Sequence, residues 1–430
     1  MSDNNGVNIL GYINKQFGLG EGVRSNIRAL TAANVPFVIN DFTDEIASDI
    51  LEENTSNVDI SKENPNKINL IQINFDNFDK VINSFGSSYL NGKYNIAFWA
   101  WELEHFPTDF QKYIDLMDEI WVPSNFCVNA ISQVSSKPVL RFMHSIEIPQ
   151  NNINREHLNL PEDRLIYLTI FDYHSTIARK NPYATIDAYE KAFGKNSQEA
   201  ILIIKTSVGE RFAKEKIELA NYIKNNKSIV LIEKTLPREE LNALINNCDV
   251  YVSLHRSEGF GLTMAEAMYF GKPVIATGYS ANVEFMNNEN SYLISYDLIP
   301  TSHNYFYSNL NCQWADANVN EASLVMRNLA DNPSERIRIG HKAKKDIQNL
   351  LSPQHIGNKI KDRLNYISEN CLLNSQNSDK EIIKTLKHEN ANLENKNNAL
   401  KNIKAIKWKL AFKNLQNRIS GKTKKYFWED

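Results

Sequence analysis

The sequence predicts an α/β protein of two domains, each built on a doubly wound parallel sheet, followed by a C-terminal helical extension. Short apolar runs alternate with longer segments suited to helices through most of the chain, a pattern typical of parallel sheets. The length of 430 residues exceeds that of an ordinary single domain. Beyond Asn374 the composition changes to Asn, Lys and Glu, which indicates a separate extension.

The apolar runs divide the chain into a first domain over residues 1–150 and a second domain over residues 160–350. The segment between them is polar and contains proline, as domain linkers commonly do. A helix over about residues 352–370 and the extension over residues 376–430 follow. The expected strands are Val7–Ile13, Phe37–Ile39, Ile68–Ile73, Tyr94–Trp101, Glu119–Val122, Val139–Phe142, Leu165–Ile170, Ile201–Lys205, Ile229–Ile232, Val250–Leu254 and Pro273–Thr277.

The composition is that of an ordinary globular protein, with 42% hydrophobic and 23% charged residues. A net charge of −3 speaks against a nucleic-acid partner. The four cysteines are scattered without metal-binding spacing, which fits reduced thiols in a cytosol. The N-terminus lacks the pattern of a secretory signal, and no apolar run reaches the roughly eighteen residues of a membrane span. We therefore expect a cytoplasmic protein.

The most informative stretch runs from Asp249 to Met286 and reads as strand, glycine-rich turn, helix and strand. Gly259 and Gly261 allow a sharp turn and a close approach of a ligand to the backbone. The helix that follows points free N–H groups at the turn, where a phosphate is favoured. Glu266 lies about one turn into that helix, where its carboxylate can accept hydrogen bonds from a pair of sugar hydroxyls.

The block SEGFGLTMAEAMYFGKPVIAT resembles the donor-site signature of retaining glycosyltransferases of the GT-B fold, glycosyltransferase family 4, also called glycosyl transferases group 1. It departs from the family pattern at Tyr269 and Phe270, where small residues are common. The resemblance implies a GT-B fold, with two Rossmann-like domains facing a cleft and the last helix returning to the first domain. It also implies a UDP-linked or GDP-linked sugar as co-substrate, with no cofactor and no metal.

The same resemblance suggests roles for residues of the second domain. Glu266 would hold the ribose hydroxyls and Glu258 the donor sugar. The segment FDYHSTIARKNP is also similar to family members, and its Arg179 and Lys180 would neutralise the diphosphate in place of a metal. The further donor-binding candidates are Lys234, Thr235, Gly259, Phe260, Gly261, Leu262 and Thr263.

Candidates in the first domain follow two of its expected strands. Gly20 and Gly22 are donor-binding candidates in a segment that resembles the glycine-rich loop of GT-B N-terminal domains, and a plain flexible turn is the alternative. Glu102, as a catalytic candidate, and His105, as an acceptor-binding candidate, lie just past a strand end, where open α/β sheets bind ligands. Trp101 is the second acceptor-binding candidate; we expect it to share one strand face with Trp99, and sugar stacking and core packing are both open for them.

The extension contains two patterns. Between residues 383 and 400, Leu and Asn recur at heptad positions, which fits either a homodimer helix or a solvated helix. Over residues 401–428, Trp408, Phe412, Leu415 and Ile419 share one helical face flanked by lysines. This pattern favours an anionic membrane surface, which would place the protein on the inner face of the cytoplasmic membrane. Docking on the protein itself or on a partner is the alternative.

The favoured function is glycosyl transfer to a glycan or lipid-linked acceptor in cell-surface polysaccharide biosynthesis, of the O-antigen, lipopolysaccharide or capsule type. A protein glycosyltransferase is the second enzymatic interpretation. A non-catalytic scaffold subunit that binds a nucleotide-sugar is the third.

Overall fold

The computed structural model describes residues 6–42, 59–207, 209–303 and 305–372, with seven isolated helical residues between 387 and 413. The chain forms two compact units, Met1–Leu364 and Asn365–Asp430. Of the heptad pattern, only Leu393 is described, and it is helical and exposed. The other heptad positions and the apolar face over residues 401–428 lie outside the described residues. No described helix is long and apolar enough to cross a membrane.

The first domain contains a six-stranded parallel sheet in the order β2-β1-β3-β4-β5-β6. An isolated parallel bridge between Ile39 and Ile60 continues the sheet beyond β2. β1 and β3 are buried along their whole length because helices cover both faces, which is why they are mostly apolar. Their buried Asn8 and Asn69 side chains hydrogen-bond to each other at 2.9 Å. The strands are β1 (Val7–Gly11), β2 (Phe37–Asp41), β3 (Ile68–Gln72), β4 (Tyr94–Phe98), β5 (Glu119–Val122) and β6 (Val139–Arg141).

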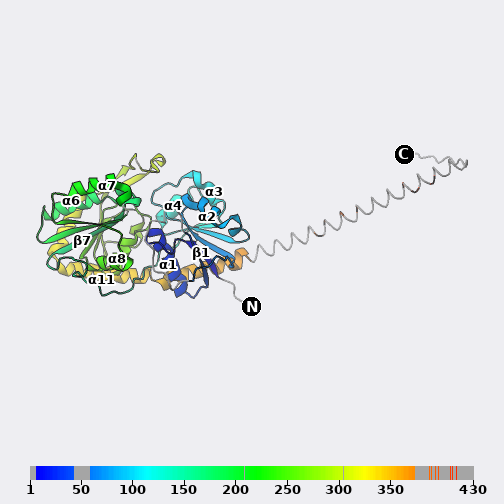
Figure 1. Cartoon of the computed structure of the whole chain (residues 1–430), viewed down its shortest axis with the longest axis horizontal. Coiled ribbons are helices and arrows are strands. Elements are labelled where there is room, and N and C mark those ends of the chain that lie inside the picture. Colours follow the sequence, from blue (N-terminus) through cyan, green and yellow to red (C-terminus); the bar gives the residue numbers. More distant parts are fainter. Residues whose placement is uncertain are drawn as a thin grey trace. The chain divides into compact units, whose positions relative to one another are not determined.

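Helix α1 lies on one side of this sheet and α2, α3 and α4 lie on the other (Figure 1). α4 begins with a side-chain cap, because Ser124 Oγ accepts a hydrogen bond from the Cys127 backbone N–H. The helices are α1 (Gly18–Ala32), α2 (Phe78–Phe85), α3 (Gln111–Ile114) and α4 (Asn125–Ser132).

The second domain repeats this architecture with a six-stranded parallel sheet in the order β12-β11-β10-β7-β8-β9. α6 and α7 cover one face of the sheet, and α8 and α11 cover the other (Figure 1). The strands are β7 (Leu165–Asp172), β8 (Ala200–Ser207), β9 (Ile229–Glu233), β10 (Val250–Ser253), β11 (Val274–Thr277) and β12 (Tyr292–Ile294). The helices are α5 (Ile177–Lys180), α6 (Pro182–Phe193), α7 (Ala213–Ile223), α8 (Arg238–Asn247), α9 (Leu262–Tyr269), α10 (Val319–Asp331) and α11 (Pro333–Leu350).

After α11, helix α12 (Pro353–Tyr366) packs on the first domain. A Cβ on Gly357 would lie 2.0 Å from the Ala29 carbonyl oxygen of α1, so only glycine permits this approach. The Lys361 ammonium donates to the Ala33 carbonyl at 3.0 Å, and Arg363 forms an ion pair with Glu119. Both sheets and the first part of α12 therefore belong to one compact unit.

Two features differ from the pattern expected from the sequence. β4 ends at Phe98, so the expectation that Trp99 and Trp101 share one face of that strand was wrong. The chain turns away from the sheet after Phe98, and both indoles are buried in the core of the first domain. The chain between β12 and α10, where no strand was expected, forms an antiparallel hairpin of β13 (Tyr296–Pro300) and β14 (Gln313–Ala317).

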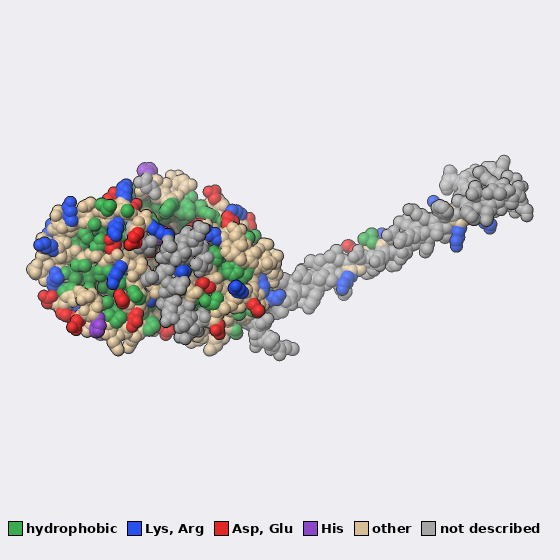
Figure 2. All heavy atoms as spheres, in the orientation of Figure 1, with side chains coloured by type: hydrophobic (Ala, Val, Ile, Leu, Met, Phe, Trp, Pro, Cys, Tyr) green, Lys and Arg blue, Asp and Glu red, His purple; other side chains and the backbone are tan. Residues whose placement is uncertain are grey.

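The described surface carries no extended patch of one charge on the face seen in Figure 2, where basic and acidic side chains are intermixed. All four cysteines are free thiols.

Candidate functional site

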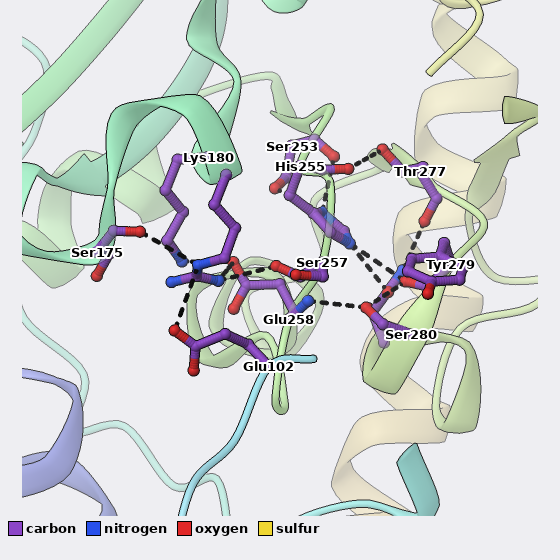
Figure 3. Close-up of polar contacts among 12 residues, drawn as sticks. Glu102, Ser175, Lys180, Ser253, His255, Ser257, Glu258, Thr277, Tyr279 and Ser280 are labelled. Carbon is purple, nitrogen blue, oxygen red and sulfur yellow. Dashed lines mark hydrogen bonds and ion pairs between the residues drawn. The ribbon is translucent and has the colours of Figure 1, made fainter. Parts of the chain in front are cut away.

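The candidate site lies where loops from the two sheets meet. β7 and β10 are neighbours at the centre of the second sheet, and their carboxyl ends lead into α5 and the Glu258 loop. This is the point where the strand order reverses, and open α/β sheets bind ligands there. Across from it, the loop after β4 in the first domain carries Glu102. Figure 3 shows the Glu102 and Glu258 carboxylates and the Lys180 side chain converging from these loops.

Arg179 is the central group of the site. Its side chain is buried, with Nη1 donating to the Ser257 carbonyl at 2.8 Å and Nε donating to the Ser175 carbonyl at 3.2 Å. The Glu102 carboxylate lies 3.5 Å from Nε, and the Glu258 carboxylate lies 3.5 Å from Nη1. Burial alone would lower the pKa of Arg179, but the two carboxylates outweigh it and raise the pKa. Nη2 has no hydrogen-bond partner among the described residues, so one edge of a firmly held guanidinium is left for a ligand.

Lys180 and Glu258 form a close ion pair beside Arg179. Burial would raise the pKa of Glu258, but Lys180 and Arg179 lower it to about 2, so the carboxylate is charged at neutral pH. Burial lowers the pKa of Lys180 from its usual value. The loop itself is held because the Glu258 N–H donates to Ser280 Oγ at 2.8 Å. Of the two Glu258 carboxylate oxygens, Oε1 contacts both Arg179 and Lys180, and Oε2 has no partner among the described residues.

At Gly259 the backbones of the two domains approach closely. Ser124 Oγ at the start of α4 donates to the Gly259 carbonyl at 2.8 Å. A Cβ on Gly259 would lie 2.5 Å from the Trp101 carbonyl oxygen, so the backbones touch where no side chain fits. Two residues later, Gly261 has φ +99° and caps α9, an angle that side chains disfavour.

Glu266 lies inside α9 and is 2% exposed. Arg238, at the start of α8, contacts Oε1 at 2.5 Å, whereas Oε2 is buried without a hydrogen-bond partner in the described structure. Burial raises the pKa of this carboxyl. A buried acceptor without a donor is costly, and a pair of ligand hydroxyls would satisfy it.

We expect Glu266→Ala to raise the dissociation constant for the donor nucleotide about 10- to 100-fold, because hydrogen bonds to a charged group contribute roughly 1.5–3 kcal/mol. Titration calorimetry measures this constant. Glu289→Ala, which alters an exposed carboxylate elsewhere in the second domain, should leave the constant unchanged. An unchanged affinity in Glu266→Ala would exclude the ribose contact.

The two candidate glycines of the first domain, Gly20 and Gly22, lie near the start of α1 and are buried. A Cβ on Gly20 would meet the Lys15 carbonyl oxygen at 2.1 Å, and one on Gly22 would meet the Gln72 side chain at 2.8 Å. Both positions thus pack against their own domain. Their donor contact stays a prediction.

The remaining sequence candidates are more scattered. Lys234 and Thr235 are exposed just after β9. His105 is exposed, with Nδ1 2.9 Å from Gln133 Oε1. Trp101 is 3% exposed and packs edge-on against Phe106, so its acceptor contact also stays a prediction.

Sequence reasoning missed several groups of the site. Arg256 Nη1 donates to the Ala178 carbonyl at 2.9 Å, and the Arg256 N–H donates to the Arg179 carbonyl at 2.8 Å. In the sequence, Arg256 and His255 lie next to the motif without a pattern that assigns them a role. Ser124 is of a residue type that caps helices. Its bond to Gly259 spans 135 positions, a separation that no local pattern signals.

Among the described residues, no three His, Cys, Asp or Glu side chains are grouped so that they could hold a metal ion.

Comparisons with known proteins agree with this architecture. Residues 151–297, which include Arg179, Lys180, Glu258 and Glu266, match the family model described as glycosyl transferases group 1. Over 84% of this chain and 99% of the other, the fold is similar to HepE from Anabaena in complex with UDP and glucose, at 12% identity and a TM-score of 0.60.

Two further solved structures show the same similarity. A glycosyltransferase from Rickettsia africae is 14% identical over 85% of this chain and 99% of its own, with a TM-score of 0.60. A sucrose-phosphate synthase from Thermosynechococcus elongatus is 14% identical over 85% of this chain and 99% of its own, with a TM-score of 0.58. The two Rossmann-like domains and these neighbours together identify an α/β protein of the GT-B fold.

Proposed function

We propose that the chain is a retaining, metal-independent glycosyltransferase of family 4 that takes its sugar from a UDP-linked or GDP-linked donor. The observation that carries the proposal is the group formed by Arg179, Lys180 and Glu258 beside the buried, unsatisfied oxygen of Glu266. Two cations suit a diphosphate, and two separated carboxylates suit two sets of sugar hydroxyls. The match of residues 151–297 to glycosyl transferases group 1 supports this assignment.

In this proposal the donor lies along the second domain. The ribose hydroxyls would bind Glu266, and the diphosphate would lie between Arg179 Nη2, Lys180 and the N–H groups at the start of α9. Those protein charges would stabilise the leaving phosphate without a metal. The sugar hydroxyls would donate to Glu258 Oε2.

The acceptor would approach from the first domain, near Glu102. The bond between the anomeric carbon and the phosphate oxygen breaks while the acceptor oxygen bonds to the same carbon from the same face. The acceptor proton passes to the leaving phosphate, so that atoms and charge balance without a protein nucleophile. Retention of configuration follows from attack on the face that the phosphate leaves.

The acceptor is proposed to be a glycan or a lipid-linked glycan in cell-surface polysaccharide biosynthesis. The basic, amphipathic sequence over residues 401–428 supports this, because lipid-linked acceptors lie at a membrane surface. The protein would be cytoplasmic and bound to the inner face of the cytoplasmic membrane. Residues 383–400 would join two copies of the chain. Intact donor-site charges argue against a non-catalytic scaffold.

Thermal unfolding with UDP, GDP, ADP, TDP and their sugars, in EDTA, tests the donor proposal. A nucleotide at a hundred times its dissociation constant should stabilise the protein by about 2.7 kcal/mol. We expect a selective upward shift with UDP or GDP, followed by metal-independent hydrolysis or transfer of the matching sugar. Absence of any shift and of any turnover would overturn the proposal in favour of a scaffold protein.

A further inference from the structure

The antiparallel hairpin between β12 and α10 projects from the second domain into the hydrophobic core of the first. We call β13, β14 and the described residues between them the clasp. Its two strands pair along five positions, from Tyr296 opposite Ala317 to Pro300 opposite Gln313. The Thr301 N–H donates to the Cys312 carbonyl at 3.0 Å, which continues the pairing toward the tip. The clasp is therefore a stiff projection.

The base of the clasp is fixed to the donor side of the cleft. The Ala315 N–H donates to the Arg256 carbonyl at 3.0 Å, and the Arg256 guanidinium forms an ion pair with Asp316 at 2.9 Å. The same guanidinium lies over the Trp314 ring, 5.9 Å from its centroid. Since Arg256 also bonds to the backbone of Ala178 and Arg179, the clasp is tied to the turn that carries the two donor-site cations.

The tip of the clasp is part of the first domain. Tyr305, Cys312 and Trp314 are buried in the same hydrophobic cluster as Trp101. Tyr307 packs edge-on against the Trp101 ring, with their centroids 4.9 Å apart. These contacts seat the tip directly beside the loop that carries Glu102.

The hydroxyl of Tyr305 reaches the candidate site itself. It donates to Glu102 Oε1 at 3.2 Å, and that oxygen lies 3.5 Å from Arg179 Nε. Tyr305 is 5% exposed, and Glu102 retains 31% of its side-chain exposure. The contacts form a closed ring from Arg179 through Glu102, Tyr305 and the clasp back to Arg256 and Arg179.

We infer that Tyr305 is a positioning residue that holds the Glu102 carboxylate against Arg179 across the cleft, and that the clasp sets the distance between the domains at this edge. The inference deepens the proposed function and rests on it for its catalytic consequence. With Oε1 engaged by Tyr305 and Arg179, Oε2 of Glu102 has no partner among the described residues and is oriented for an acceptor hydroxyl. A hydroxyl in the second domain would thereby control a carboxylate of the first.

Tyr305→Phe keeps the buried ring and removes only the hydroxyl. We expect kcat for transfer to fall about 10-fold, because a misplaced group near the reacting atoms is costly. The dissociation constant for the donor should stay within twofold, since the donor groups lie in the second domain. Tyr307→Phe is the matched control, because its ring packs on Trp101 and its hydroxyl has no hydrogen-bond partner among the described residues. Its kcat should stay within twofold of the parent.

A double-mutant cycle with Glu102→Ala, which removes the acceptor of the Tyr305 hydroxyl, separates positioning from packing. If Tyr305 acts through Glu102, Tyr305→Phe should add less than a twofold further loss of kcat to Glu102→Ala. Losses that multiply would overturn the inference.

The same double-mutant cycle is also measured through the midpoint of thermal unfolding of each variant, which needs no substrate. If the two substitutions shift the unfolding midpoint non-additively but no variant shows turnover, the contact between Tyr305 and Glu102 is supported and the proposed function is rejected. If the protein turns over but the two substitutions act independently, only the contact is rejected. If the midpoint shifts are additive and there is no turnover, both are rejected.

Discussion

Lys180→Met is expected to lower kcat for sugar transfer by about 10²–10³-fold, the loss typical when one positively polarised group at a developing negative charge is removed. Among the described residues the Lys180 ammonium contacts only the Glu258 carboxylate, and that carboxylate keeps Arg179 as a second cation when Lys180 is replaced. Arg179, by contrast, also bonds to the Ser175 and Ser257 carbonyls. Lys180 is therefore the position at which the cationic contribution to leaving-group departure can be tested without dismantling the site.

Single-turnover rates with the donor identified by thermal unfolding measure this effect. Lys195→Met is the matched control, because Lys195 is an exposed lysine of the same domain with only a 3.9 Å contact to Glu190. The double variant Lys180→Met with Glu258→Gln distinguishes two roles. If Lys180 only neutralises Glu258, the double variant has the same rate as Glu258→Gln alone. If Lys180 stabilises the phosphate, the double variant is slower than Glu258→Gln alone. A kcat within twofold of the parent in Lys180→Met would contradict the proposed role.

The elements that sequence patterns predicted best are the strands. Every strand listed from the apolar runs begins within one residue of its expected start. The reason is that strands buried on both faces are mostly apolar, so a short apolar run in the sequence marks where such a strand begins, as at Ile68 for β3. The ends of strands were predicted less well. The strand expected over Tyr94–Trp101 stops at Phe98, because Trp99 and Trp101 pack into the core beside the sheet.

The clasp could not be predicted, because its aromatic residues are buried by a different domain. Tyr305 is 203 positions from Glu102, and the 305–317 stretch has no helical or alternating pattern of its own. The roles of Gly20 and Gly22 in α1 were also difficult to predict from the sequence. A glycine that makes room for a neighbouring carbonyl, as Gly20 does for Lys15, reads in sequence like one that makes room for a ligand.

The site therefore combines two kinds of information. The residue types needed for a nucleotide-sugar could be chosen from the motif, since Arg179, Lys180, Glu258 and Glu266 lie in two short segments. The charge and the hydrogen bonding of these side chains could not be predicted, because they depend on partners from elsewhere in the chain. Glu258 is held charged by two cations, whereas Glu266 is buried beside Arg238 with one oxygen unsatisfied.

Gly259→Ala should slow transfer by about 10- to 100-fold while leaving donor affinity nearly unchanged. The added Cβ would lie 2.5 Å from the Trp101 carbonyl oxygen and 3.3 Å from its carbonyl carbon. Both are backbone atoms, so no side chain can move aside. The clash is relieved only if the Glu258 loop and the loop after β4 separate, and a displacement of about 1 Å at reacting groups can cost roughly 10² in rate.

Donor affinity is the internal reference for this variant, because Glu266 and Arg238 lie within the second domain and do not cross the contact. Gly18→Ala is the matched control: a Cβ there meets nothing within 4 Å, so rate and unfolding midpoint should stay near the parent values. A loss of donor binding equal to the loss of rate would mean that the new methyl group blocks the donor itself. A parent-like rate would mean that the approach of the Gly259 and Trp101 backbones is not required for transfer.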